Sequence, residues 1–227
     1  MKSANDTPIL SPHWQPASSD IKLEDHSIDI WRLHLDRVET DSTLLSQDER
    51  EKTAGLISIE LQQRYMAVRC GLRLILSHYL PLSAEQLEFR KKANGKPYLD
   101  SGLCFNISHS GKLALIAITE SNEIGIDLEP IKPRANMVRI AQRVFQSEDI
   151  ELIMNASTEV DRIDLFTLAW TRLEARQKMT GNGLFGDKAT PPHQLFHFTP
   201  RDNWMATVAI ADSDQTIKLR FLDFENE

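Results

Sequence analysis

Residues 124–130 read Ile-Gly-Ile-Asp-Leu-Glu-Pro and place two carboxylates, Asp127 and Glu129, in an otherwise apolar run. Such a run is typical of a buried strand, and a strand directs residues two apart to the same face. The two carboxylates therefore point the same way, where they repel each other and are costly to desolvate. A cation that prefers oxygen ligands, such as Mg²⁺, would remove both costs. An exposed strand end with two solvated acids is the alternative.

The chain as a whole has the composition of an ordinary globular protein. Its 227 residues are 41% hydrophobic and 26% charged, enough for one large domain or two of about 100 residues each. The formal charge of -7 argues against general nucleic-acid binding, because phosphate backbones require concentrated lysine and arginine. No run approaches the ~18 apolar residues that span a bilayer, and residues 1–6 lack a signal-peptide layout, so we expect a cytoplasmic protein. Cys70 and Cys104 lack metal-type spacing and predict reduced, buried thiols.

Hydrophobic periodicity predicts helices and a few strands in each half of the chain, with a division near residues 120–122. Alternation over 27–38 predicts a strand buried on one face. Ser46, followed by acids, predicts an N-cap that opens a helix to about residue 59, and apolar spacings of three and four predict a second helix over 60–79. Further strands are predicted over 113–119, 124–130, 194–198, 205–210 and 217–221, and further helices over 136–144, from 147 and over 162–179.

Cations in the first half could meet an anion. Arg69 and Arg73 are four residues apart on the second predicted helix and share one of its faces, and solvated surface arginines are the alternative. Asn94-Gly95 indicates a tight turn, after which Lys96 is held on the rigid, extended backbone that precedes a proline. This lysine could meet a phosphate or be an ordinary surface residue.

Small polar residues gather over 104–111 around a single histidine. Backbone amides at the Ser/Gly turn, together with the Ser108 and His109 side chains, could hold an anionic phosphate. A lone histidine is also compatible with a structural role. A serine hydrolase is not favoured, because Ser108 and His109 have no evident acidic third partner.

Four stretches stand in a defined order along the chain. They are Gly95-Lys-Pro-Tyr-Leu, Phe105-Asn-Ile-Ser-His-Ser-Gly, Ile124-Gly-Ile-Asp-Leu-Glu and Trp170-Thr-Arg-Leu-Glu-Ala-Arg-Gln-Lys, the last followed by Gly181-Asn-Gly-Leu. Together they resemble the 4′-phosphopantetheinyl transferases of the long, surfactin-synthetase-activating type, over about residues 28 to 185. The resemblance implies an α+β fold with two similar halves, residues 1–120 and 121–227, related by a pseudo-twofold axis. It also implies that coenzyme A lies in the cleft between the halves.

The activity implied by the resemblance is transfer of the 4′-phosphopantetheine arm of coenzyme A to a serine of an apo carrier protein, with release of adenosine 3′,5′-bisphosphate. A monomer is implied, since one chain holds both halves. The metal ligands would be Asp127, Glu129 and Glu174, binding Mg²⁺. Glu174 would also accept the serine proton, directly or through a metal-bound water, and Lys178 would stabilise charge in the transition state.

The coenzyme A contacts also follow from the resemblance. The matching positions are Arg69, Gly95, Lys96, Pro97, Ser108, His109, Asp127 and Lys178, with Lys52 and Arg73 as further candidates. Cations concentrated in one cleft can hold an anion even in an acidic protein. The carrier protein is expected to dock near residues 181–193.

One position departs from the family pattern Trp-x-x-Lys-Glu-Ala, because Leu173 stands where a lysine precedes the glutamate. A cation beside the metal and phosphates is therefore missing. Arg172 is adjacent in sequence but about 100° away around the helix. The spacing of Glu174 and Lys178 is by itself also typical of a helical ion pair. The alternatives are a non-catalytic binder of coenzyme A or of a carrier protein, and another magnesium-dependent phosphoryl or nucleotidyl enzyme.

Overall fold

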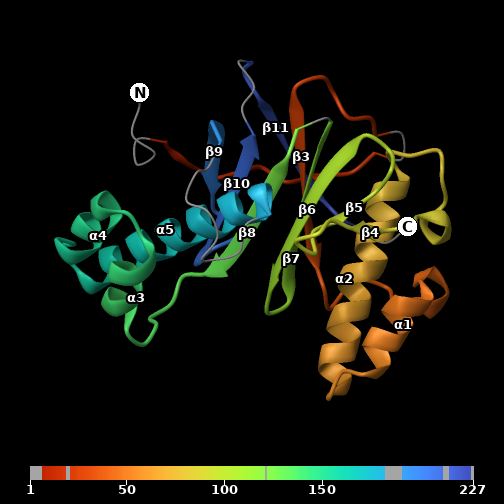
Figure 1. Ribbon diagram of the computed structural model, residues 1–227, viewed down its shortest axis with the longest axis horizontal. Coiled ribbons are helices and arrows are strands. Elements are labelled where there is room, and N and C mark those ends of the chain that lie inside the picture. Colours follow the sequence, from red (N-terminus) through yellow and green to blue (C-terminus); the bar gives the residue numbers. More distant parts are fainter. Residues whose placement is uncertain (1–6, 19–20, 121, 182–190, 212–214, 226–227) are drawn as a thin grey trace. The chain divides into compact units, whose positions relative to one another are not determined.

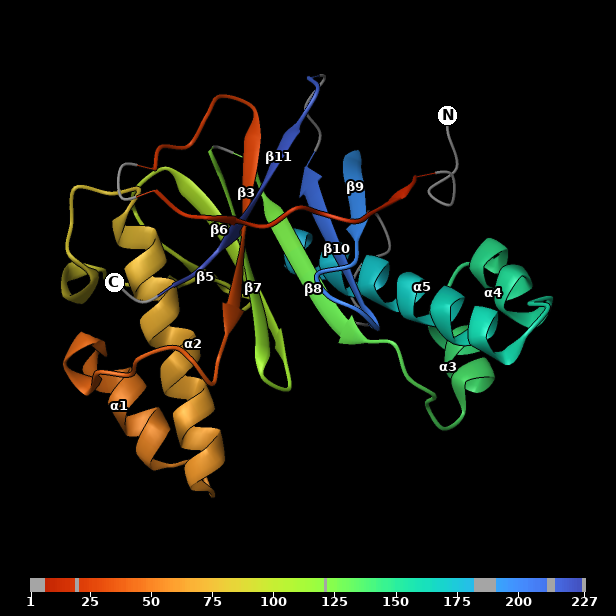
Figure 2. The same cartoon turned by 180° about the vertical axis from the view of Figure 1, so that it is seen from behind.

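The computed structural model describes residues 7–18, 21–120, 122–181, 191–211 and 215–225. It has the predicted α+β architecture, and the chain divides into two compact units, each built on its own sheet (Figures 1 and 2). The N-terminal unit comprises His13–Ser121 and Gln215–Glu227, and the C-terminal unit comprises Met1–Pro12 and Asn122–Asp214. Each chain end therefore belongs to the unit formed mainly by the opposite half of the sequence.

A five-stranded sheet with the order β2-β11-β3-β7-β6 forms the N-terminal unit. Its middle strand β3 pairs antiparallel with β7 and parallel with β11. The parallel pairing is possible because β11 comes from the far end of the chain and not from a hairpin. The strands of this unit are β2 (Gln15–Pro16), β3 (Ser27–His34), β6 (Leu103–Ser110), β7 (Leu113–Glu120) and β11 (Lys218–Asp223), with a separate small hairpin of β4 (Arg90–Lys91) and β5 (Pro97–Tyr98).

Helix α2 (Ile59–Ser77) packs its apolar face on this sheet, as its spacing of three and four predicts (Figure 1). Helix α1 (Gln47–Ala54) precedes it and begins with a capping box, in which Ser46 accepts from the Glu49 amide and Glu49 accepts from the Ser46 amide. The predicted N-cap is thus confirmed, although the helix ends earlier than residue 59. The described residues also include the short 3₁₀ turns η2 (Ser42–Leu44) and η3 (Ala84–Gln86).

The C-terminal unit has a four-stranded sheet with the order β1-β9-β10-β8. The long helix α5 lies across one face of β8 and β10 (Figure 1). Thr158 caps its first turn, and Gly181 ends it in the left-handed conformation. The elements of this unit are β1 (Ile9–Leu10), β8 (Ile124–Pro130), α3 (Met137–Val144), α4 (Ser147–Met154), α5 (Glu159–Thr180), β9 (His193–Phe198) and β10 (Trp204–Ala211). No helix in the described part of the chain is long and apolar enough to cross a membrane.

Candidate active site

Strand β8 aims its two acids at the face that α5 covers. Ile124, Ile126 and Leu128 fill the buried positions of the opposite face, so the intervening Asp127 and Glu129 share one side of the strand, as predicted. Asp127 is only 4% exposed. A carboxylate this deeply buried requires a charged or hydrogen-bonding neighbour.

Gly125 lets helix α5 approach β8 closely. A Cβ atom at this position would lie 2.1 Å from the carbonyl oxygen of Ala175 and 2.3 Å from the amide nitrogen of Met179. These distances are far inside van der Waals contact, and both neighbours are backbone atoms that cannot rotate away. Only glycine fits, and the resulting close packing brings the next turns of α5 to the acids of β8.

Lys178 of α5 bonds Asp127 directly, with 2.7 Å between Nζ and Oδ1. Glu174, one turn earlier on the helix, is half-buried. Burial raises the pKa of Glu174, and the neighbouring charges of Asp127 and Glu129 raise it further against the opposing effect of Lys178. The structure thus brings together two pairs, Asp127 with Glu129 and Glu174 with Lys178, that only the resemblance had linked to each other.

Arg134, which the sequence reasoning missed, is a second cation in this cluster. Its Nη2 atom lies 2.7 Å from Oε2 of Glu129, and its guanidinium lies over the Trp170 ring, 5.5 Å from the centroid. Burial raises the pKa of Glu129, Arg134 lowers it, and Asp127 raises it, with a net upward shift. An arginine in a loop after a strand has no sequence signal that would have identified this contact.

No cation takes the place of the missing lysine at position 173 on α5 itself. Leu173 is half-buried, and the adjacent Arg172 is 3% exposed and paired with Asp149 of α4. Burial and the charge of Arg172 lower the pKa of Arg176, one turn further along the helix. Arg172 is therefore engaged in the packing of α5 against α4, about 100° around the helix from position 173.

A buried polar chain connects α5 to the sheet beside Asp127. Thr207 of β10 is paired in register with Asp127 on one side and with His197 of β9 on the other. Its Oγ1 lies 2.8 Å from Oγ1 of Thr171 and 3.0 Å from Nδ1 of His197. Thr171 also donates to the Leu168 carbonyl. The bond to Leu168 uses the single hydroxyl proton of Thr171. The Thr207 hydroxyl therefore donates to Thr171 and accepts from the Nδ1–H of His197.

The carboxylates of the acidic cluster are contacted by cations of the protein itself. Among the described residues, no group of three or more histidine, cysteine, aspartate or glutamate side chains is arranged to hold one. Lys178 instead bonds an oxygen atom of Asp127, and Arg134 bonds an oxygen atom of Glu129. The donor set still suits a hard divalent cation, because the charges of Asp127 and Glu129 raise the pKa of Glu174, and the charge of Asp127 raises the pKa of Glu129, so the oxygen atoms of the three carboxylates lie near one another.

The arginines of α2 are part of the packing of the N-terminal unit. Arg69 and Arg73 both pair with Glu49 of α1 and lie over the Phe89 ring, 4.5 and 5.0 Å from its centroid. Arg73 is 1% exposed and also donates to two backbone carbonyls at 2.9 Å. Arg69 keeps 13% of its side chain exposed. The solvated-surface interpretation is therefore wrong for Arg73, which is a buried structural cation.

The other predicted contacts of coenzyme A also lie in the N-terminal unit. Ser108 is buried and His109 is exposed on β6, and adjacent strand residues point to opposite faces of the sheet. Gly95 has a φ of 86° and lies in the turn between β4 and β5. Pro97 is the first residue of β5. Lys96 is half-buried in the same turn.

Lys52, the remaining candidate, is an exposed residue of α1, and its Nζ lies 4.9 Å from the centroid of the Tyr65 ring. The predicted carrier-docking stretch includes residues 182–190, which lie outside the described residues.

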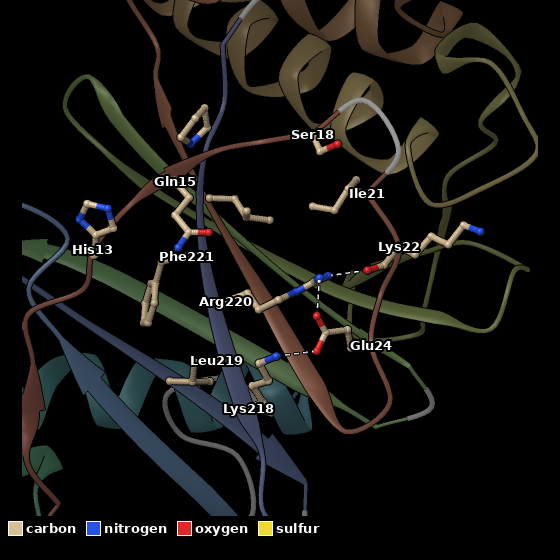
Figure 3. Close-up of a pocket in the computed structure, with 12 residues that line it drawn as sticks. His13, Gln15, Ser18, Ile21, Lys22, Glu24, Lys218, Leu219, Arg220 and Phe221 are labelled. Atoms are coloured by element: carbon tan, nitrogen blue, oxygen red, sulfur yellow. Dashed lines mark hydrogen bonds and ion pairs between the residues drawn. The ribbon is translucent and has the colours of Figure 1, made fainter.

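A pocket of about 540 Å³ opens beside β11 in the N-terminal unit (Figure 3). Arg220 points across it to Glu24 and the Lys22 carbonyl, and Lys218 also pairs with Glu24. The same arginine binds both carboxylate oxygens of the fully buried Asp29 on β3. These contacts fasten the C-terminal strand to the sheet, and none of the predicted site residues lines this pocket.

The comparisons with known proteins agree with the two-unit architecture. Residues 29–121 match the family model "4′-phosphopantetheinyl transferase, N-terminal", and residues 123–226 match "4′-phosphopantetheinyl transferase superfamily". The chain belongs to the 4′-phosphopantetheinyl transferases, in the two-domain type, and acts on carrier proteins.

Individual relatives support this assignment. The chain is 32% identical to 4′-phosphopantetheinyl transferase HetI of Nostoc sp. (strain PCC 7120 / SAG 25.82 / UTEX 2576), over 89% of this chain and 95% of HetI. It is 26% identical to 4′-phosphopantetheinyl transferase gsp of Aneurinibacillus migulanus, over 63% of this chain and 59% of that relative. It is 37% identical to 4′-phosphopantetheinyl transferase AcpT of Escherichia coli (strain K12), over 48% of this chain and 55% of AcpT.

Proposed function

We propose that the protein transfers the 4′-phosphopantetheine arm of coenzyme A to a serine of an apo carrier protein, in a reaction that depends on Mg²⁺. The observation that carries the proposal is the coupled cluster of Asp127, Glu129, Glu174 and Lys178 in one unit of a chain of this family. The serine oxygen forms a bond to the phosphorus that bears the pantetheine. The bond from that phosphorus to the bridging oxygen breaks, and adenosine 3′,5′-bisphosphate leaves.

Glu174 is the residue we assign as the base. A serine hydroxyl is a weak nucleophile near neutral pH and needs a group that accepts its proton as the new bond forms. The pKa of Glu174 is raised by burial and by Asp127, which makes its carboxylate a stronger base than an exposed one. The half-buried position leaves the side chain partly accessible.

Lys178 and Asp127 supply the charge around the base. The ammonium of Lys178 offsets the buried charge of Asp127 across 2.7 Å. A cation held in a partly dehydrated position stabilises negative charge that develops on a phosphate more than it would in water. Lys178 is 28% exposed and Asp127 is 6% exposed at the side chain, so the lysine is the partner that an incoming phosphate can reach.

The residues that would hold Mg²⁺ are Asp127, Glu129 and Glu174. When bound, the ion supplies positive charge that neutralises the phosphate oxygens of the substrate. Lys178 and Arg134 must then share or release oxygen atoms that they contact in the free protein. Binding of Mg²⁺ therefore exchanges protein cations for the metal ion at these carboxylates.

Ser108, His109 and Lys96 are proposed as phosphate contacts of coenzyme A, with Gly95 and Pro97 shaping the turn and Asp127 and Lys178 at the reacting end. Arg69 and Lys52 are proposed as more peripheral charges. Arg73 is withdrawn as a ligand, because it is 1% exposed and fully engaged by Glu49 and two carbonyls.

The experiment is mass spectrometry of apo carrier proteins after incubation with the enzyme, coenzyme A and Mg²⁺. A mass gain equal to one phosphopantetheine arm is expected, and it should require the divalent cation. Asp127→Asn should reduce the rate at least ~100-fold, whereas Asp202→Asn, which changes an exposed residue of the same unit, should not. Absence of any mass gain across fatty-acid, polyketide and peptide carrier classes would contradict the proposal.

A non-catalytic binder is the second candidate, favoured by Leu173 and by the engagement of Arg172 with Asp149. Calorimetry separates the two functions, because a binder would retain tight coenzyme A affinity in a preparation that modifies none of the carriers.

A further inference from the structure

The free protein carries its own counter-ions in the acidic cluster. Three carboxylates, from Asp127, Glu129 and Glu174, lie near two cations, Lys178 and Arg134. Lys178 is a predicted site residue. Arg134 is not, and it takes no part in the bond-making and bond-breaking steps proposed above.

Arg134 is held in place from three directions. The chain leaves β8 at Pro130, and the amide of Ile131 donates to the Asn203 carbonyl at 2.8 Å, which anchors the start of the loop. The loop then turns the Arg134 side chain back to Glu129, five residues earlier. Its planar guanidinium lies over the ring of Trp170, the kind of stacking that fixes an arginine in one orientation.

The Trp170 contact places Arg134 beside the base as well. Trp170 and Glu174 are four residues apart on α5, so they share one face of the helix. The guanidinium therefore lies on the face that presents Glu174, one turn toward the helix N-terminus. Arg134 and Glu129 are 24% and 23% exposed, so the pair is neither sealed in the core nor fully screened by water.

We propose that Arg134 is a resident counter-ion that competes with the divalent cation for Glu129 and so makes tight metal binding depend on the anionic substrate. The inference rests on the proposed function and concerns the order in which its components assemble. A guanidinium and a divalent cation at the same carboxylate repel each other, and each weakens the hold of the other. The free protein therefore binds the cation weakly.

The substrate relieves this competition in two ways. Its phosphate oxygens are additional ligands for the cation, so fewer protein oxygens are needed. They are also acceptors for a guanidinium released from Glu129, which binds phosphate through paired N–H donors. Cation and coenzyme A should consequently strengthen each other's binding, and Arg134 should carry part of that coupling.

The experiment measures Mn²⁺ affinity by isothermal titration calorimetry, with and without saturating coenzyme A and without any carrier protein. Arg134→Met removes the charge and keeps apolar contact with Trp170. It should bind Mn²⁺ alone about fivefold or more tightly than the parent, and coenzyme A should then tighten Mn²⁺ binding by a smaller factor than in the parent. Arg139→Met, which removes an exposed charge on α3, should match the parent in both measurements.

Arg134→Lys keeps the charge but loses the paired donors, so its Mn²⁺ affinity should fall between those of the parent and Arg134→Met. If the methionine variant does not fold, the lysine variant provides the test. Unchanged or weaker Mn²⁺ binding in the variants, with the parent binding Mn²⁺, would overturn the inference and leave the proposed function standing. If no protein binds Mn²⁺ even with coenzyme A present, the proposed metal site fails and the inference fails with it.

Discussion

Lys178 on α5 and Asp127 on β8 are separated by 51 residues in sequence, and their side chains lie 2.7 Å apart. The contact exists because the helix backbone reaches the strand backbone at Gly125. A larger residue there would push α5 away and separate the lysine from the aspartate. The glycine of the β8 motif thus acts on the site through packing.

Gly125→Ala should therefore destabilise the protein by about 3 kcal/mol or more and abolish transfer, because the added methyl group meets two backbone atoms. Denaturant unfolding followed by circular dichroism gives the free-energy change. Gly55→Ala is the matched control. Its Cβ would lie 3.6 Å from the nearest backbone oxygen, so stability should change by less than about 1 kcal/mol. Equal stability losses in the two variants would contradict the packing argument.

Thr207→Val should break the buried chain from His197 to Thr171 without changing the volume of the side chain. Two buried partners lose a hydrogen bond, which should cost about 1–3 kcal/mol. Because Thr171 is three residues before Glu174, kcat should also fall, with little change in KM for coenzyme A. Thr207→Ser retains the hydroxyl and should recover most of kcat. If serine and valine are equally slow, the hydroxyl has no positioning role.

Glu174→Gln should remove the base and, at the same time, stabilise the fold at neutral pH. The pKa of Glu174 is raised above its ordinary value of 4.5 in the folded protein, so the folded state holds a proton that the unfolded state has already lost. Stability contributed by this group therefore falls as the pH rises from the unfolded to the folded pKa. Glutamine cannot lose that proton.

Thermal unfolding across pH 4 to 8 (about the range that spans carboxyl titration) measures this effect. The glutamine variant should exceed the parent in melting temperature by a margin that grows as the pH rises. Glu151→Gln, an exposed change on α4, should show no such trend. A constant difference at all pH values would mean that Glu174 does not titrate as described.

Leu173→Lys should give transfer activity equal to or higher than that of the parent, measured as carrier modification per unit time. Leu173 is half-buried and Arg172 is held by Asp149, so neither position 173 nor Arg172 supplies a free cation beside Glu174. A lysine would add positive charge next to Glu174. Leu152→Lys, which changes an exposed residue of α4, is the charge control. A sharp loss of activity specific to Leu173→Lys would identify Leu173 as a required packing residue.

Local sequence patterns were sufficient for most of the secondary structure. Ser46 and Glu49 form a capping box in which donors and acceptors lie three residues apart, and α2 and α5 follow apolar spacings that reflect one helical face. The strand predicted over 27–38 extends four residues beyond the end of β3, because the pairing of β3 with β7 ends at His34. Boundaries depend on partners that the local pattern does not contain.

Long-range ion pairs were not predictable in this way. Arg69 and Arg73 resembled surface cations, because a sequence does not indicate that Glu49 lies between them and Phe89 lies beneath them. Arg134 resembled an ordinary loop residue. In each case the partner is a charged or aromatic group brought close by packing, and neither charge nor aromatic character carries the periodicity that marks an element.

The sequence by itself determined that Asp127 and Glu129 share a face of one strand, since a strand repeats every two residues, and that Glu174 and Lys178 share a face of one helix. Only the tertiary structure decided that these two faces meet, that Lys178 bonds Asp127, and that Arg134 holds Glu129. The physical reason is that periodicity is a property of neighbouring residues, whereas close packing at Gly125 depends on atoms some 50 residues away.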